Sequence, residues 1–150
     1  MLRHNWVLLV EDNPDHVALA VRALKKSGMA WHVVVARDGV EALACLQGPG
    51  SAGSVGPEAL PALVLLDLKL PRVDGLEVLR QIRSDVRTHL LPVVVLSSSD
   101  EERDVVGAYS LGANSYVRKP LDFDAFVEAM RQIGGYWLGL REDVSGSDRG

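Results

Sequence analysis

Short apolar runs alternate along the chain with longer stretches that have the 3.6-residue periodicity of amphipathic helices. The runs are Trp6–Val10, Val33–Ala36, Leu63–Leu66, Val93–Leu96 and the shorter, more polar Ser115–Arg118. Continuous apolar runs rich in β-branched residues are typical of strands that are covered on both faces in a parallel sheet. Strand and helix units in this alternation predict an α/β fold with a doubly wound, five-stranded parallel sheet.

The helical stretches begin at residues that commonly cap helices. The expected caps are Asn13, Asp38, Asp74, Asp100 and Asp122. Pro14 suits a first helical position because it has no N–H to leave unpaired. Glu41, three residues after Asp38, resembles the second half of a capping box. Gly28 and Gly112 are predicted to end the first and fourth helices, since glycine adopts the left-handed conformation at low cost.

Polar residues directly follow the apolar runs. Glu11 and Asp12 come after the first run, Asp67 after the third, Ser97 after the fourth, and Lys119 after the fifth. Right-handed crossovers bring the carboxyl ends of parallel strands to one edge of the sheet. Ligands bind at that edge where the strand order reverses. We therefore expect three carboxylates, a hydroxyl and an ammonium to meet there.

Carboxylates within about 5 Å of one another repel, and one takes up a proton unless a cation intervenes. Lys119 alone does not neutralise three acids, and Mg²⁺ is a hard cation that takes carboxylate, carbonyl and water oxygens. Each residue also has a purely structural interpretation. Glu11 and Asp12 could cap a helix, and Asp67 could belong to the turn before Pro71. Lys119 could be a solvated lysine on an edge strand.

Four segments look like the signature segments of response-regulator receiver domains. They are Val7–Asn13, Leu66–Gly75, Pro92–Ser97 and Gly112–Pro120. The resemblance covers about residues 5–134, and its most specific parts are the Asp-x-x-x-Pro-x-x-Asp-Gly run and the Lys-Pro pair. It implies a flavodoxin-like receiver fold with strand order 2-1-3-4-5.

The resemblance implies a role for each acid at the expected site. Asp67 resembles the phosphoacceptor, a nucleophilic carboxylate that takes a phosphoryl group from a phosphohistidine. Glu11 and Asp12 resemble the acidic pair that holds Mg²⁺ together with Asp67. The backbone carbonyl of Lys69 is implied as the remaining protein ligand of the metal.

The same resemblance implies how the phosphoryl group is held and sensed. Ser97 matches the hydroxyl that hydrogen-bonds a phosphoryl oxygen, and Lys119 matches the cation that pairs with it. Tyr116 matches the switch aromatic, which turns in from the surface as helix 4, strand 5 and helix 5 are remodelled. The Lys119–Pro120 peptide bond is expected to be cis, as is usual in this family.

Residues 1–134 are predicted to form the receiver and residues 135–150 a C-terminal extension with a frayed tail. Trp137 and Leu138 either fold back onto the core or form a dimer contact, because exposed apolar groups beyond a domain need a partner. The extension and the Glu-Asp-Asn-Pro-Asp-His start resemble single-domain receivers that pair with bacterial phytochrome histidine kinases and commonly form homodimers. The expected protein is a phosphorelay switch and not an enzyme.

Composition excludes several other classes. The formal net charge of −4 gives no basic surface for nucleic acid. No apolar run reaches the roughly 20 residues that a membrane span requires. The single cysteine, Cys45, fits a reducing cytosol, so we expect a cytoplasmic protein without nucleic-acid or membrane partners.

Two enzyme-like or cofactor-binding alternatives remain on a similar sheet. Aspartyl-nucleophile phosphatases usually carry a second aspartate two residues after the first, where this chain has Lys69. The loops after the first and third strands are acidic and not glycine-rich, which disfavours a nucleotide or flavin site. His16, His32 and His89 lack the spacing of metal ligands and are expected to be ordinary surface or helix-face residues.

Overall fold

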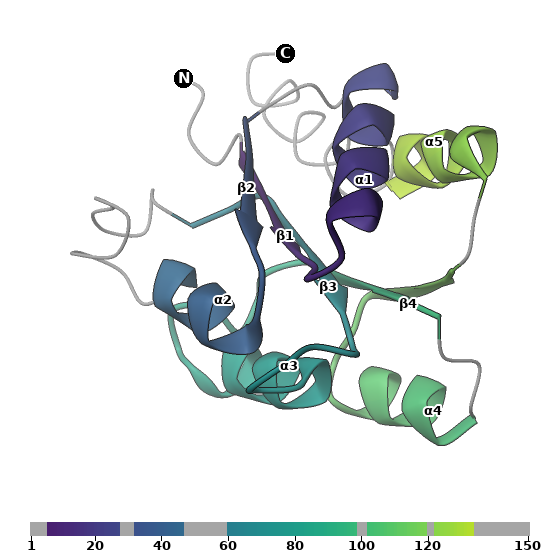
Figure 1. Ribbon diagram of the computed structural model, residues 1–150. Coiled ribbons are helices and arrows are strands. Elements are labelled where there is room, and N and C mark those ends of the chain that lie inside the picture. The colour runs from purple at the N-terminus through teal and green to yellow at the C-terminus, as the bar shows by residue number, and fades with distance from the viewer. Residues whose placement is uncertain (1–5, 28–31, 47–59, 99–101, 120–121, 134–150) are drawn as a thin grey trace, which may run out of the picture.

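The computed structural model describes residues 6–27, 32–46, 60–98, 102–119 and 122–133. Five parallel strands form one sheet in the order β2-β1-β3-β4-β5, which confirms the predicted topology (Figure 1). The strands are β1 (Trp6–Val10), β2 (His32–Ala36), β3 (Leu63–Asp67), β4 (Val93–Ser97) and β5 (Ser115–Arg118). The helices are α1 (Pro14–Lys26), α2 (Gly39–Leu46), α3 (Gly75–Ser84), α4 (Glu102–Ser110) and α5 (Phe123–Ile133).

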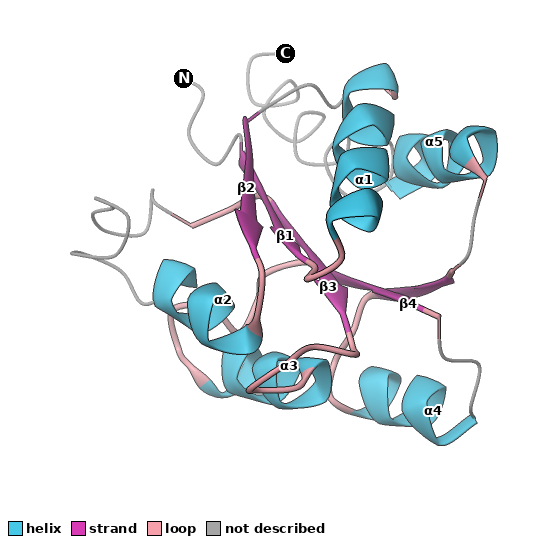
Figure 2. Ribbon diagram, viewed as in Figure 1, coloured by secondary structure: helices cyan, strands magenta, loops and turns pink. Residues whose placement is uncertain are grey.

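The sheet separates two layers of helices. Helices α1 and α5 lie on one face, and α2, α3 and α4 lie on the other (Figure 2). Side chains alternate between the faces along each strand. Val7 and Leu9 of β1 accordingly join the apolar cluster under α1 and α5, whereas Leu8 and Val10 join the cluster under α2, α3 and α4. Each layer therefore has its own core.

Burial differs between the strands. Every residue of β3 and β4 is buried, including Asp67 and Ser97, which are the last residues of their strands. The prediction that all strands are covered on both faces is wrong for β2, where only Ala36 is fully buried. The reason is its place at the edge of the sheet, where it has β1 as a neighbour on one side.

Side-chain caps fix the starts of the helices as predicted. The Asn13 side chain accepts hydrogen bonds from the backbone N–H groups of Asp15 and His16, at 2.9 and 3.3 Å. Asp38, Asp74 and Asp122 each accept from the N–H group three residues later. Glu41 departs from the ideal capping box, because its carboxylate accepts from the N–H of Arg37, one residue before the cap. The predicted cap Asp100 lies outside the described residues.

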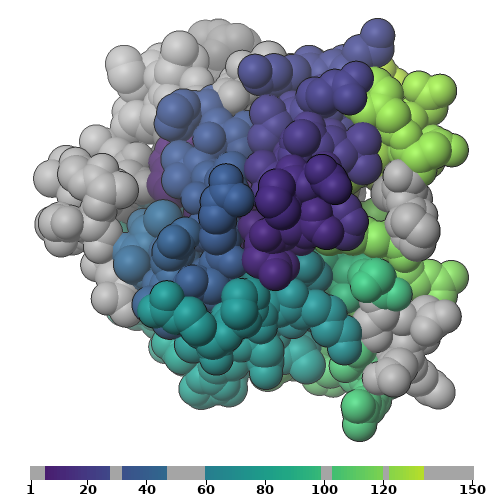
Figure 3. Space-filling model, in the orientation of Figure 1, coloured from purple at the N-terminus to yellow at the C-terminus, as the bar shows by residue number. Residues whose placement is uncertain are grey.

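Strand order reverses between β1 and β3. From β1 the chain crosses to β2 on one side, whereas the next crossover leads to β3 on the other. Loops that leave in opposite directions open a crevice at the carboxyl ends of these strands. The space-filling view shows the start of α1, in dark purple, beside the teal β3–α3 region (Figure 3). The predicted acidic residues lie at this crevice.

Gly75 lets α3 begin close to the end of β3. Its backbone N–H donates to the carbonyl oxygen of Leu68 at 3.0 Å. A Cβ atom at position 75 would lie 2.5 Å from the Cα of Leu68 and would collide with the carbonyl oxygen of Asp67. The glycine is therefore required by a close approach of two backbone segments.

Within the described residues, no helix is long and apolar enough to cross a membrane.

Candidate metal and phosphoryl site

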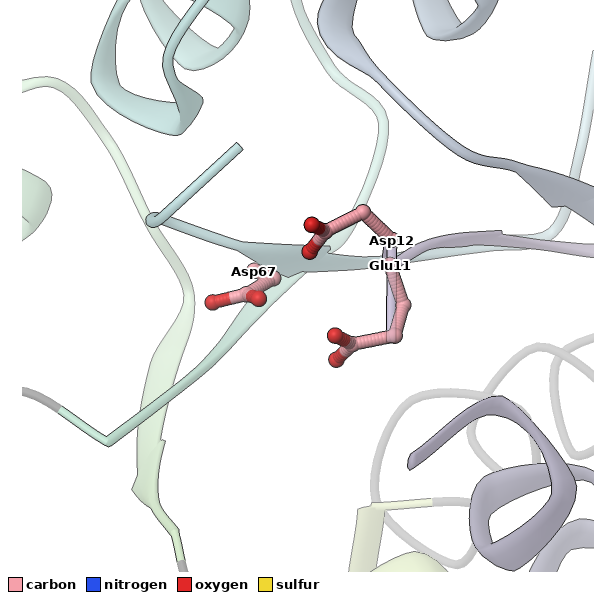
Figure 4. A group of neighbouring side chains, drawn as sticks. All are labelled: Glu11, Asp12 and Asp67. Atoms are coloured by element: carbon pink, nitrogen blue, oxygen red, sulfur yellow. The ribbon is translucent and has the colours of Figure 1, made fainter. Parts of the chain in front are cut away.

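Three carboxylates meet at the crevice between β1 and β3. Glu11 and Asp12 follow β1 and Asp67 ends β3, and one oxygen from each side chain lies within 4.8 Å of the others. Figure 4 shows the three side chains turned toward a common space. Glu11 and Asp67 are buried, with exposed fractions of 3% and 6%, whereas Asp12 is exposed to solvent. The expected convergence of these acids is present in the structure.

Lys119 brings a positive charge to the acids from the far side of β4. Its backbone N–H donates to the carbonyl oxygen of Ser97 at 2.8 Å, which continues the pairing of β5 with β4. Its ammonium contacts the carboxylate of Glu11 and lies 3.6 Å from Oδ2 of Asp67. The lysine is therefore at the site, but in this state its hydrogen-bonded acid is Glu11.

Burial perturbs the ionisation of Asp67. The pKa of its carboxyl is raised to about 6, chiefly because the group has lost solvent and also because the Glu11 carboxylate is near. The Lys119 ammonium and the backbone N–H of Lys69, which donates to Oδ1 at 3.2 Å, act in the opposite direction. Asp67 therefore gives up its proton less readily than an ordinary aspartate does.

The residues present fit a hard divalent cation. When ionised, the three carboxylates carry three negative charges, and the Lys119 ammonium offsets one of them. An all-oxygen donor set with excess negative charge suits Mg²⁺ or Mn²⁺ better than softer metals. The backbone carbonyl of Lys69 belongs to the loop that follows Asp67 and stays a predicted ligand.

The other predicted residues lie around this centre. Ser97 is fully buried at the end of β4, beside Asp67 at the end of the neighbouring β3. Tyr116 is half-buried on β5 and packs against the apolar cluster under α2, α3 and α4. The predicted cis peptide bond involves Pro120, which lies outside the described residues.

His16 is a site residue that the sequence reasoning missed. It lies in the first turn of α1, and its Nδ1 is 3.1 Å from Nζ of Lys119 and 3.6 Å from Oε2 of Glu11. The interpretation of His16 as an ordinary helix-face residue is therefore corrected. The signal available in the sequence was its place three residues after the helix cap Asn13, at the same edge of the sheet as Glu11.

Ion pairs hold the loop that follows Asp67. Lys69 lies 3.8 Å from Asp104 of α4, and Arg72 lies 3.2 Å from Asp38 at the start of α2. A cleft of about 410 Å³ opens beside Asp12 and is lined in part by Lys69 and Asp104. Asp12 therefore borders an open space on the side of the loop that follows Asp67.

Residues 7–131 match the family described as the response regulator receiver domain. The protein FilR2 of Methanothrix harundinacea is 44% identical over 133 residues, which span 89% of this chain and 83% of that protein. Among solved structures, the Mn²⁺-bound form of response regulator Rcp1, a Synechocystis protein, is 36% identical with a TM-score of 0.77. That alignment covers 89% of this chain and 94% of the other.

A second solved structure is that of the phosphorylated cyanobacterial phytochrome response regulator RcpA. It is 38% identical to this chain and has a TM-score of 0.78. The alignment covers 90% of this chain and 94% of RcpA. In each of these comparisons the similarity extends over most of both proteins.

Proposed function

The chain belongs to the response regulator receiver family and acts in phosphorelay signalling, and we propose that Asp67 is its phosphoacceptor, with Mg²⁺ held beside it. One observation carries the proposal: the buried Asp67 carboxylate shares a crevice with Glu11, Asp12 and the Lys119 ammonium. A carboxylate nucleophile needs this combination, because charge on the transferring phosphoryl oxygens must be offset without covalent help from other groups.

In the proposed transfer, an oxygen of Asp67 attacks the phosphorus atom of a phosphohistidine. The new O–P bond forms as the N–P bond breaks, and the bonding electrons leave with the imidazole nitrogen, which later takes a proton from solvent. Lys119 shifts from Glu11 toward a phosphoryl oxygen, and the Ser97 hydroxyl donates a hydrogen bond to another. These groups position and stabilise the phosphoryl group.

Glu11, Asp12, Asp67 and the backbone carbonyl of Lys69 would hold the metal. When bound, Mg²⁺ supplies positive charge that offsets the charge on the phosphoryl oxygens. The cluster of acid oxygens and the excess of negative charge support this choice. The Mn²⁺-bound form of the similar protein Rcp1 supports it independently.

The proposed readout is a change on the face formed by α4, β5 and α5. An aspartyl phosphate adds negative charge and acceptor oxygens beside Ser97. Closure of the β4–α4 connection on these oxygens would make room into which Tyr116 turns. The half-buried position of Tyr116, the second residue of β5, supports a switch of this kind.

The proposed donor is a sensor histidine kinase, and more narrowly a bacteriophytochrome, because RcpA is a phytochrome response regulator. We propose a cytoplasmic switch that forms a homodimer, with a receiver at residues 1–134 and an extension at residues 135–150. Trp137 and Leu138, the candidates for the dimer contact, lie outside the described residues. In this proposal the protein is not a phosphatase, and Lys69 occupies the place of the second aspartate that such enzymes usually carry.

Incubation with acetyl phosphate and Mg²⁺, followed by intact-mass measurement, tests the phosphoacceptor assignment. The expected result is a gain of one phosphoryl group, about 80 Da, that is absent in Asp67→Ala and after chelation of Mg²⁺. Asp124→Ala, which removes an exposed acid from α5, is the matched control and should still gain the mass. An unchanged mass in the folded wild-type protein would reject the assignment.

The dimer proposal has a separate test. Light scattering should give twice the chain mass for the wild type and the mass of one chain for Trp137→Ser with Leu138→Ser. A monomeric wild type would reject the homodimer proposal but would not affect the assignment of Asp67 as the phosphoacceptor.

A further inference from the structure

The His16 ring contacts the cation of the site. Its Nδ1 lies 3.1 Å from Nζ of Lys119, and the His16 side chain is itself about half exposed. We propose that His16 is a positioning residue for phosphoryl transfer, which accepts a hydrogen bond from Lys119 and holds its ammonium beside Asp67. The inference rests on the proposed function and assigns a role to a residue outside the metal and phosphoryl ligands.

The direction of this hydrogen bond follows from the chemistry of the two groups. A lysine ammonium can only donate, so Nδ1 of His16 must offer its lone pair. The neutral ring then carries its proton on Nε2. The nearby Oε2 of Glu11 is 3.6 Å from Nδ1, beyond hydrogen-bond length, and accepts instead from the backbone N–H of Asn13 at 3.2 Å. Lys119 is therefore the partner of Nδ1.

The contact matters because the other partner of Lys119 is a proposed metal ligand. The ammonium is shared between Glu11 and His16 and lies 3.6 Å from Oδ2 of Asp67. If Glu11 holds the metal, as proposed, its carboxylate would be less available to Lys119. His16 stays as an acceptor that keeps the ammonium within reach of Asp67.

The backbone that carries the acceptor is fixed in place by its helix. The backbone N–H of His16 donates to the capping side chain of Asn13, and α1 packs against α5 in a shared apolar cluster. A cavity of about 360 Å³ is lined by His16, Lys119 and the apolar side chains of Leu19, Leu96 and Phe126. Hydrogen bonds are stronger in such apolar surroundings. A rigid acceptor lowers the entropy cost of ordering the long lysine side chain.

Two substitutions separate the hydrogen bond from the bulk of the side chain. His16→Asn places an acceptor oxygen on Cγ, where His16 carries Nδ1. His16→Leu removes the acceptor and fills the position with an apolar side chain. His89→Leu removes an exposed histidine of the α3–β4 connection and serves as the control. The measurements are the maximal phosphorylation rate at saturating acetyl phosphate and Mg²⁺, the affinity for Mg²⁺, and stability to urea.

We expect His16→Leu to lower the maximal rate about 3- to 10-fold, with half-saturation by acetyl phosphate unchanged. His16→Asn should recover most of that loss, and His89→Leu should match the wild type. A role limited to folding would instead lower urea stability in His16→Leu and would not be rescued by asparagine. A wild-type rate in His16→Leu, or equal loss in both His16 variants with stability intact, would overturn the proposal.

A second measurement does not depend on phosphorylation. In mildly alkaline buffer without metal, nitrogen NMR of the His16 ring should show the proton on Nε2, and a ring protonated on Nδ1 would overturn the proposed contact. Failure of the wild type to gain a phosphoryl mass would instead reject the assignment of Asp67. The two failures are therefore distinguishable.

Discussion

The ammonium of Lys119 contacts the carboxylate of Glu11, although β3 and β4 separate their strands in the sheet. The lysine side chain is 11% exposed and the glutamate 3% exposed, so this ion pair lies largely out of solvent. It occupies a carboxylate that we propose as a metal ligand. If Glu11 is a metal ligand, as proposed, Lys119 and the metal would compete for its carboxylate.

Lys119→Met should change metal binding and phosphorylation in opposite directions. Removal of the positive charge should strengthen Mg²⁺ binding about tenfold, since the acids lose a competing cation. The same change should slow phosphorylation at least roughly tenfold, since the phosphoryl oxygens lose their cation. Calorimetric titration with Mg²⁺ and rates from acetyl phosphate check both effects. Lys26→Met, at an exposed position of α1, is the control, and weaker Mg²⁺ binding in Lys119→Met would contradict the competition.

Asp67→Asn should stabilise the metal-free protein at neutral pH. The folded-state pKa of Asp67 is raised from 3.8 to about 6, so the folded protein holds this proton more tightly than the unfolded chain. The resulting stability is fully present below about pH 4 and is lost as the pH rises through about 6. At pH values above about 6, the free energy of unfolding is lower by up to about 3 kcal/mol.

Urea unfolding between these pH values measures the effect. The free energy of unfolding of Asp67→Asn should nearly equal that of the wild type at about pH 4 and exceed it increasingly toward neutral pH. The difference should become smaller when Mg²⁺ is added. Asp124→Asn, at an exposed acid, should show no such growth. A pH-independent difference for Asp67→Asn would contradict the assigned cause.

Gly75→Ala should destabilise the fold and disturb the phosphoacceptor. The added Cβ meets the backbone of Asp67 and Leu68, which must shift to admit it. The expected cost is about 2 kcal/mol or more of unfolding free energy, together with slower phosphorylation. Gly107→Ala is the matched control, because a Cβ there lies 3.7 Å from Leu76 and α4 gains a better helix former. It should stabilise by about 0.5 to 1 kcal/mol, and equal effects of the two alanines would contradict this reasoning.

Arg83→Met should cost far more stability than Arg80→Met on the same helix. The Arg83 guanidinium donates to the carbonyl oxygens of Gly112, His89 and Leu91, and burial lowers its pKa. Its loss leaves these acceptors without a charged donor and should cost about 2 to 3 kcal/mol. Arg80 makes an exposed pair with Glu77, and its loss should cost little, because solvent screens such a pair. Chemical denaturation measures the unfolding free energy of both variants. Similar losses in Arg83→Met and Arg80→Met would contradict the prediction.

Local patterns predicted most of the fold. Apolar runs marked the strands, and Asn13 and Asp74 marked helix starts, because strand burial and capping depend on nearby residues. The meeting of Glu11 with Asp67 also followed from sequence, since chain topology fixes which strand ends are neighbours.

Contacts between long side chains were not predictable in the same way. The role of His16 depends on where the Lys119 side chain turns, and the two residues are 103 positions apart. The preference of Lys119 for Glu11 over Asp67 depends likewise on distances of a few ångströms across β4. No sequence pattern indicates that Arg83 binds the α4–β5 connection, because its acceptors there are backbone carbonyl groups, which every residue has.

The two apolar clusters on opposite faces of the sheet have a further consequence. Helices α1 and α5 are anchored in one cluster and α4 in the other, so the face formed by α4, β5 and α5 joins both layers. A partner that bound this face would therefore contact helices of both layers. The acidic crevice at the end of the sheet is what both sides share.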